Sequence, residues 1–126
     1  MIAGIGFDLV AIKRVEEMLA RKEQRALDRL FTKHEQEYAL ARARPAMHLA
    51  ARLAAKEAAF KALTGSDEAK LIGWKEAEVR RGSEGAPELV FTGRAAARAA
   101  ELQVRRVHLT LSHTDETAGA VVILEA

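Results

Sequence analysis

The feature that most constrains the fold is an alanine-rich segment from about Ala46 to Leu63, which consists almost entirely of helix-forming residues. Alanine has the highest helix propensity of all residues, so this segment predicts a long helix of about five turns. Pro45 lacks a backbone N–H and biases Arg44 away from helical angles, and it therefore separates this helix from any helix before it. Gly65 is placed to cap the C-terminal end.

One face of this predicted helix carries an apolar stripe that a charged residue interrupts. The stripe consists of Leu49, Leu53, Phe60 and Leu63. Lys56 falls inside it by the 3.6-residue period, and its ammonium group either extends to the edge of the core or points into a polar site at the border. Glu57 lies at the margin of the stripe and Lys61 follows one turn later. This pair is either an ordinary exposed ion pair or part of a site.

An N-terminal strand is predicted over residues 2–10, where the residue types alternate with a period of two. One side carries Ala3, Ile5, Phe7 and Leu9, and the other carries Gly4, Gly6 and Asp8. We expect the apolar side to pack and the glycine side to stay open. Because glycines weaken a strand, their presence indicates close approach of a ligand or of another backbone. Asp8 either caps the helix that follows or belongs to a site.

The next segment, residues 12–21, predicts an amphipathic helix. Its inward side consists of Ile12, Val15 and Leu19, whereas Arg14, Met18 and Arg21 lie together on the opposite side. Two guanidinium groups beside an exposed methionine suit either an acidic partner helix or a solvated basic surface. Farther along, Thr32 and Glu35 have the spacing of a capping box, which predicts a helix that runs to about Arg42.

The second half of the chain predicts a small sheet. Strands are expected over residues 76–80, 89–92, 106–112 and 118–124, with a turn over 82–87 and a helix over 93–102. The short link between the last two strands favours antiparallel pairing. We therefore expect one α+β domain over residues 1–126, in which a small, mainly antiparallel sheet packs against the long alanine-rich helix.

The composition narrows the function classes. The chain is 49% hydrophobic and 30% charged, as in globular proteins, and it lacks Cys, which excludes disulfides, thiolate zinc sites and cysteine nucleophiles. The apolar N-terminal stretch contains Asp8 and has no basic n-region, so we expect neither a signal peptide nor a membrane span, and a cytoplasmic location. The net charge of +2 indicates an anionic partner. P-loop, HExxH, EF-hand, GxSxG and complete GxGxxG motifs do not occur.

Two carboxylates and several basic residues are candidates for a phosphate site. Asp8 and Glu57 are the carboxylates, and the basic candidates are Arg52, Lys56, Lys61, His108 and His113. Mg²⁺ prefers a few carboxylate oxygens together with waters and substrate phosphates, and Lys and Arg neutralise the remaining phosphate charge. The two carboxylates lie far apart in the sequence, so this site depends on the fold to bring them together.

Three segments of the sequence resemble the signature blocks of the holo-acyl-carrier-protein synthases, the small 4'-phosphopantetheinyl transferases of fatty acid biosynthesis. These segments are GIGFDLV at residues 4–10, RLAAKEA at 52–58 and KAL at 61–63. Supporting blocks include Gly73-Trp74, Gly85-Ala86-Pro87 and LTLSH at residues 109–113. In order, the blocks cover nearly all of the chain. The sequence departs from the common pattern at Thr114, where an aspartate often follows the second histidine.

The resemblance implies transfer of phosphopantetheine from coenzyme A to a serine of apo-acyl carrier protein, with release of adenosine 3',5'-bisphosphate. It implies that Asp8 and Glu57 hold Mg²⁺, with Mn²⁺ as a possible replacement, and that Lys61 stabilises charge on the pyrophosphate. The serine proton would pass to a metal-bound water or to Glu57. The residues implied to contact coenzyme A are Arg52, Lys56, Lys61, His108, Ser112 and His113.

The resemblance also implies protein partners. The first helix of this family docks the acidic recognition helix of acyl carrier protein, so Arg14, Met18 and Arg21 are expected to form a docking face whose binding weakens with salt. Family members are homotrimers with the coenzyme A cleft between subunits, and a homotrimer is therefore expected. Neither nucleic acid nor a membrane is expected as a partner.

Two other interpretations start from the same residues. A small basic nucleic-acid-binding module would explain the arginine content, but only 5% of the residues are aromatic and no nucleic-acid motif occurs. A magnesium-dependent phosphodiesterase would use the same carboxylates with water as the acceptor in place of a protein serine. The identity of the product separates the phosphodiesterase from the transferase.

Overall fold

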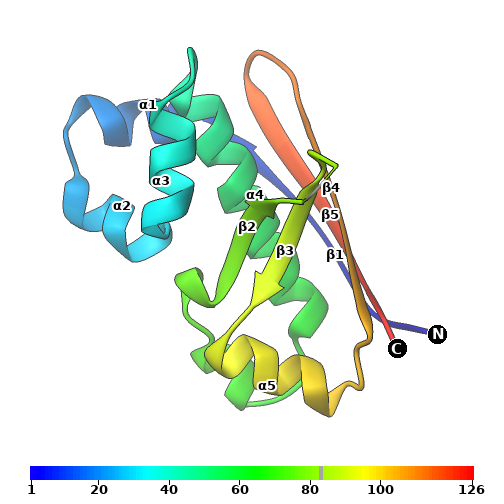
Figure 1. Cartoon of the computed structure of the whole chain (residues 1–126). Coiled ribbons are helices and arrows are strands. Elements are labelled where there is room, and N and C mark those ends of the chain that lie inside the picture. Colours follow the sequence, from blue (N-terminus) through cyan, green and yellow to red (C-terminus); the bar gives the residue numbers. More distant parts are fainter. Residues whose placement is uncertain (83) are drawn as a thin grey trace.

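A computed structural model describes residues 1–82 and 84–126 and shows the α+β architecture that the sequence predicts (Figure 1). The elements in chain order are β1 (Ile2–Ala11), α1 (Ile12–Ala20), α2 (Gln24–Leu30), α3 (Lys33–Leu40), α4 (Pro45–Leu63), η1 (Glu68–Leu71), η2 (Trp74–Glu76), β2 (Ala77–Arg81), β3 (Pro87–Phe91), α5 (Gly93–Glu101), β4 (Arg106–His113) and β5 (Thr117–Glu125). Helices α1 to α3 gather beside the N-terminal half of α4, and α5 lies beside its C-terminal end.

The strands form two antiparallel sheets. The larger sheet has the order β1-β5-β4, with Phe7 opposite Val121 and Val121 opposite Thr110. The smaller sheet is the β2–β3 hairpin. Because β1 and β5 are antiparallel neighbours, the two ends of the chain lie side by side, and the amide of Ala126 donates to the carbonyl of Met1 at 2.7 Å.

Helix α4 is the central element of the fold. It packs against β1 and β5 on one side, against α1 and α3 on another, and against β2. Thirteen of its nineteen residues are buried, which explains why small alanines occur all around it and not on one face alone. The predicted boundaries of this helix are confirmed to within one residue, and Gly65 follows the helix with a φ of +113°, as expected for a C-terminal cap.

The packed and open sides of β1 are the reverse of the prediction. Gly4 and Gly6 face α4, and a Cβ atom at Gly6 would overlap the carbonyl oxygen of Ala58. The apolar side chains point away from the core, and Ile5, Phe7 and Leu9 are 62%, 55% and 59% exposed. Glycine therefore allows strand and helix backbones to touch, which confirms that these glycines mark close approach of another backbone.

The capping box is confirmed at the start of α3. The side chain of Thr32 accepts from the amide of Glu35 at 3.2 Å, and the carboxylate of Glu35 accepts from the amide of Thr32 at 2.9 Å. The helix ends at Leu40, two residues before the predicted end. Helix α2 was not predicted, because it is mostly polar and only Leu27 and Leu30 are buried against the core.

The predicted elements of the second half are present. The hairpin, α5 and the antiparallel β4–β5 pair form within one or two residues of the expected boundaries. Position 83 of the predicted 82–87 turn lies outside the described residues. Two short helical turns, η1 and η2, were not predicted, because four and three residues are too short for a periodic pattern.

Candidate functional site

The fold brings the two predicted carboxylates together. Asp8 lies on the glycine side of β1, opposite Ala120, and Glu57 and Lys61 lie one turn apart on α4. Because Gly6 allows β1 to touch α4, the carboxyl groups of Asp8 and Glu57 meet at the edge of the core. Their side chains are 16% and 24% exposed, so both remain reachable from solvent.

The two carboxyl groups have opposite pKa shifts. Burial opposes ionisation of Asp8, but hydrogen bonds with Glu57 and Lys61 outweigh it and hold the pKa of Asp8 below its usual value. Burial raises the pKa of Glu57 to about 7, and the adjacent carboxyl group of Asp8 adds to the increase. At neutral pH the pair is therefore close to sharing one proton, as expected when two carboxylates compete for one position.

Two basic side chains partly neutralise this pair. The Lys61 Nζ lies 2.9 Å from the Asp8 Oδ1 and also donates to the carbonyl oxygen of Phe7 at 3.0 Å. The Arg14 Nη1 lies 3.8 Å from the Glu57 Oε1. Lys61 therefore pairs with Asp8 across the strand–helix contact, and the simple Glu57–Lys61 pair along one helix is not the arrangement that the structure shows.

The donors in this cluster fit a divalent cation. When Glu57 is ionised, the buried Asp8 Oδ2 receives no hydrogen bond, which leaves an oxygen that a cation would satisfy. Across the described ranges, no group of three or more His, Cys, Asp or Glu side chains could hold a metal. The chain would thus supply two carboxylates, a number typical of Mg²⁺ sites that also use waters and substrate phosphates.

A second cluster of positive charge surrounds Tyr38 on α3. The guanidinium carbons of Arg42, Arg52 and Arg81 lie 3.6, 4.2 and 5.4 Å from the centre of its ring, and the His48 ring packs edge-on at 5.7 Å. These arginines form no ion pair with a carboxylate in the described part of the chain. Their charges hold the pKa of Tyr38 below its usual value, although burial opposes this shift. The cluster is therefore suited to an anionic ligand.

Arg52 is the only member of this cluster among the predicted site residues. It is buried on α4, donates from Nη1 to the His48 carbonyl at 3.2 Å, and keeps Nε without a partner. In the sequence, the spacing of Tyr38 and Arg42, one helical turn apart, was the signal that could have indicated this cluster. The contribution of Arg81 could not be found this way, because it comes from the distant strand β2.

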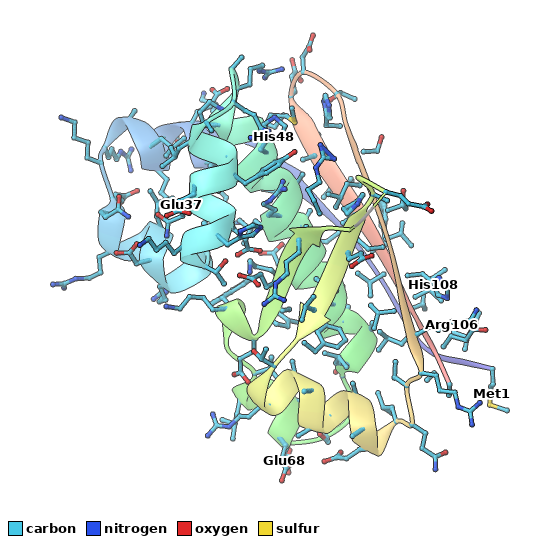
Figure 2. All side chains as sticks on the ribbon, in the orientation of Figure 1. Met1, Glu37, His48, Glu68, Arg106 and His108 are labelled. Carbon is cyan, nitrogen blue, oxygen red and sulfur yellow. The ribbon has the colours of Figure 1, made fainter. Side chains whose placement is uncertain are left out.

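The three predicted coenzyme A contacts on β4 do not lie at one place. His113 lies near the arginine cluster, where it contributes to the lowered pKa of His48 after burial and two arginines. Ser112 and His113 line a shallow hollow of about 200 Å³ with Phe7 and Leu9. His108 bonds instead to the Glu125 Oε1 at 2.9 Å near the chain termini (Figure 2).

Lys56 lies inside the protein and not at the surface of the site. Its Nζ forms a fully buried ion pair with the Glu35 Oε1 at 2.8 Å and donates to the carbonyls of Trp74 and Ala77 at 3.0 and 2.8 Å. Glu35 in turn accepts from the amide of Val79. Lys56 is thus neither at the edge of the core nor in an open polar site, and its side chain ties α4 to α3, η2 and β2.

The predicted docking face lies on α1. Arg14 is exposed on this helix and Arg21 is exposed at its C-terminal cap, whereas Met18 is half-buried and packs against the core, so the expectation of an exposed methionine is corrected. Met18 is less exposed than predicted because α1 packs against both α2 and α4. Among the helices described, none is both long and apolar enough to cross a membrane.

Comparison with known proteins places this geometry in a family. Residues 4–121 match the model of the 4'-phosphopantetheinyl transferase superfamily. A holo-[acyl-carrier-protein] synthase of Thermus thermophilus is 50% identical over 127 residues, covering 100% of this chain and 95% of the relative. Among solved structures, the holo-[acyl-carrier-protein] synthase of Neisseria meningitidis has a TM-score of 0.84 at 28% identity, and both chains are covered in full. A synthase of Bacillus anthracis in complex with CoA (3',5'-ADP) has a TM-score of 0.77 at 34% identity, covering 100% of this chain and 98% of that one. The chain therefore belongs to the holo-[acyl-carrier-protein] synthase family of the 4'-phosphopantetheinyl transferase superfamily.

Proposed function

We propose that this protein transfers the 4'-phosphopantetheine group from coenzyme A to a serine of apo-acyl carrier protein. The products are holo-acyl carrier protein, which fatty acid biosynthesis uses, and adenosine 3',5'-bisphosphate. The observation that carries this proposal is the convergence of Asp8, Glu57 and Lys61 in a chain of the synthase family. The named relatives and the coenzyme A complex of the Bacillus anthracis synthase support the same reaction.

The reaction needs charge neutralisation more than covalent chemistry. Asp8 and Glu57 would hold Mg²⁺, or Mn²⁺ in its place, and a bound divalent ion neutralises charge on the pyrophosphate. The serine oxygen forms a bond to the β-phosphorus while the bond from that phosphorus to the leaving bisphosphate oxygen breaks. Lys61 would stabilise the charge that develops there. Among the groups of this chain, the Glu57 carboxylate, which lies beside Asp8, is the candidate acceptor of the serine proton.

The cluster around Tyr38 is proposed to bind phosphate of the coenzyme A nucleotide. Arg52 has an unpartnered Nε there, and His113 lies close enough to affect His48. Ser112 lies beside His113 in the hollow of the sheet and would contact the nucleotide with it. Lys56 takes no part, because the Glu35 carboxylate and two carbonyls already occupy its buried ammonium group.

We also propose that the chain, residues 1–126, acts as a single domain within a homotrimer. The apolar outer side of β1 supports this, because Ile5, Phe7 and Leu9 expose large side chains that a second subunit would cover. His108 lies apart from the arginine cluster and would contact coenzyme A only in a cleft shared between subunits. The expected cytoplasmic location stays a prediction.

The carrier protein is proposed to dock on α1 through Arg14, Met18 and Arg21. Two exposed guanidinium groups flanking a half-buried methionine are suited to an acidic helix that also presents an apolar side chain. Arg14 also lies next to Glu57, so an acceptor docked on α1 would be adjacent to the carboxylate pair.

The proposal is tested by intact-mass spectrometry of apo-acyl carrier protein incubated with this protein, coenzyme A and Mg²⁺. We expect the carrier to gain one phosphopantetheine, and we expect EDTA to prevent the gain. Asp8→Ala and Glu57→Gln should abolish the transfer, whereas Glu68→Gln, an exposed carboxylate on η1, should not. Cleavage of coenzyme A without modification of any carrier would instead indicate a phosphodiesterase.

A further inference from the structure

Arg14 lies between the carboxylate pair and the proposed docking face. Its side chain is 55% exposed on α1, one turn before Met18 and two turns before Arg21, which caps the C-terminal end of the helix. Its Nη1 is also 3.8 Å from the Glu57 Oε1. One guanidinium group can therefore reach both a carboxylate of this chain and an acidic group of a docked partner, but it cannot pair fully with both.

The two carboxylates are neutralised by different elements of the fold. Lys61 holds Asp8 and is tethered by a second hydrogen bond to the carbonyl of Phe7. Arg14 holds Glu57 at a distance beyond hydrogen bonding, and this is its only ion pair within the described ranges. The Arg14 contact is therefore the weaker of the two and the more easily exchanged for another anion.

A guanidinium group beside Glu57 opposes the binding of a divalent cation to the same carboxylate, because the two positive charges repel each other at short range. An acidic helix docked on α1 would offer Arg14 carboxylates at hydrogen-bonding distance and draw it away from Glu57. We propose that Arg14 is a positioning residue that couples carrier docking to metal binding, holding Glu57 until the carrier takes its guanidinium group. This inference rests on the proposed function.

Coupling of this kind is reciprocal, so a docked carrier should tighten metal binding by the same factor by which the metal tightens carrier binding. The couplings usual between two sites begin at about fivefold. We therefore expect an increase of about fivefold in metal affinity when Arg14 no longer holds Glu57. Arg21 caps the C-terminal end of α1 and carries the same charge but forms no ion pair with Glu57, so it provides a matched control.

The experiment measures binding of Mn²⁺ to the full chain without coenzyme A, by electron paramagnetic resonance of the free ion. Arg14→Gln should bind Mn²⁺ about fivefold more tightly than the unmodified protein. Arg21→Gln and the charge-conserving Arg14→Lys should bind it like the unmodified protein. An equal increase in Arg14→Gln and Arg21→Gln would show an effect of net charge alone, and unchanged affinity in Arg14→Gln would exclude the contact; either result overturns the proposal.

A second measurement adds an apo-carrier whose acceptor serine is replaced by alanine. We expect this carrier to raise the Mn²⁺ affinity of the unmodified protein and to leave that of Arg14→Gln unchanged. The same increase in both proteins, or in neither, would overturn the coupling. The transfer reaction, followed separately by intact mass, tests the proposed function, so a failure of coupling with normal transfer is distinguishable from a failure of transfer itself.

Discussion

Replacing Gly6 by alanine places a methyl group between the backbones of β1 and α4. The new Cβ would overlap the carbonyl oxygen of Ala58 and lie 2.7 Å from its carbonyl carbon and 3.1 Å from the amide nitrogen of Ala62. These are backbone atoms of a buried helix, so no side chain can rotate away. Ordinary contact begins at 3.4 Å, so the Ala58 carbonyl carbon alone requires strand and helix to separate by about 0.7 Å, and the overlapping oxygen requires more.

This separation acts on both stability and the site. Overpacking of a core costs about 1–3 kcal/mol, and we expect Gly6→Ala to reach the upper end because the contacts are with backbone. Asp8 is two residues along the same strand and would move away from Glu57 and Lys61. A displacement of about 1 Å in a reacting geometry can lower the rate roughly 100-fold, and we expect a loss of that order in the rate constant of phosphopantetheine transfer.

Two assays check this expectation. Urea denaturation at one protein concentration measures the change in unfolding free energy, and intact-mass spectrometry measures transfer to the carrier. Gly73→Ala is the control, because its Cβ would be 3.2 Å from the flexible carboxylate of Glu76 and needs only a small adjustment. If Gly6→Ala stays within about 0.5 kcal/mol of the unmodified protein and transfers at the same rate, then Gly6 is not the spacer that places Asp8.

Three further predictions concern other parts of the molecule. Lys56→Met leaves the carboxylate of Glu35 buried without its cation, so urea denaturation should show a loss of about 3–5 kcal/mol, and adding Glu35→Gln should recover part of it; no recovery would contradict the ion-pair explanation. In EDTA, the raised pKa of Glu57 means that the folded chain retains a proton that the unfolded chain loses near pH 4.5, so stability should fall as the pH rises from 4.5 through about 7. The urea midpoint of Glu57→Gln should not fall over this pH range. If the midpoints of Glu57→Gln and of the unmodified protein change with pH in parallel, the raised pKa of Glu57 is refuted. Phe7→Asp should convert a sedimenting trimer into a monomer, and an unmodified protein that already sediments as a monomer would rule out the proposed assembly.

Much of the local structure follows from the sequence because its signals are local. The alanine-rich segment with Pro45 before it and Gly65 after it predicts α4 almost to the residue. The Thr32–Glu35 spacing predicts the start of α3, since a capping box involves only one turn of chain. Alternation in β4 correctly separates its polar side from its apolar side. Each of these patterns depends on residues within one helix or strand.

Periodicity within single elements does not predict where the candidate site lies. Asp8 and Glu57 were singled out by residue type and by resemblance to a family, and nothing in their spacing brings them together. Only packing of β1 on α4 does so, through the glycines that allow the two backbones to touch. Arg81 joins Arg52 around Tyr38 for the same reason, because the hairpin folds back over α4.

The sequence by itself determined which residues share a face of each predicted element, where those elements begin and end to within about two residues, and which residue types are available for chemistry. Only the tertiary structure decided which of these faces became the interior. Period-two alternation is the same whether the apolar or the glycine side of β1 is covered, and the close approach of α4 chose the glycine side. Lys56 shows the same limit, since its partner Glu35 lies on another helix, and a buried cation is stable only when the fold supplies that partner.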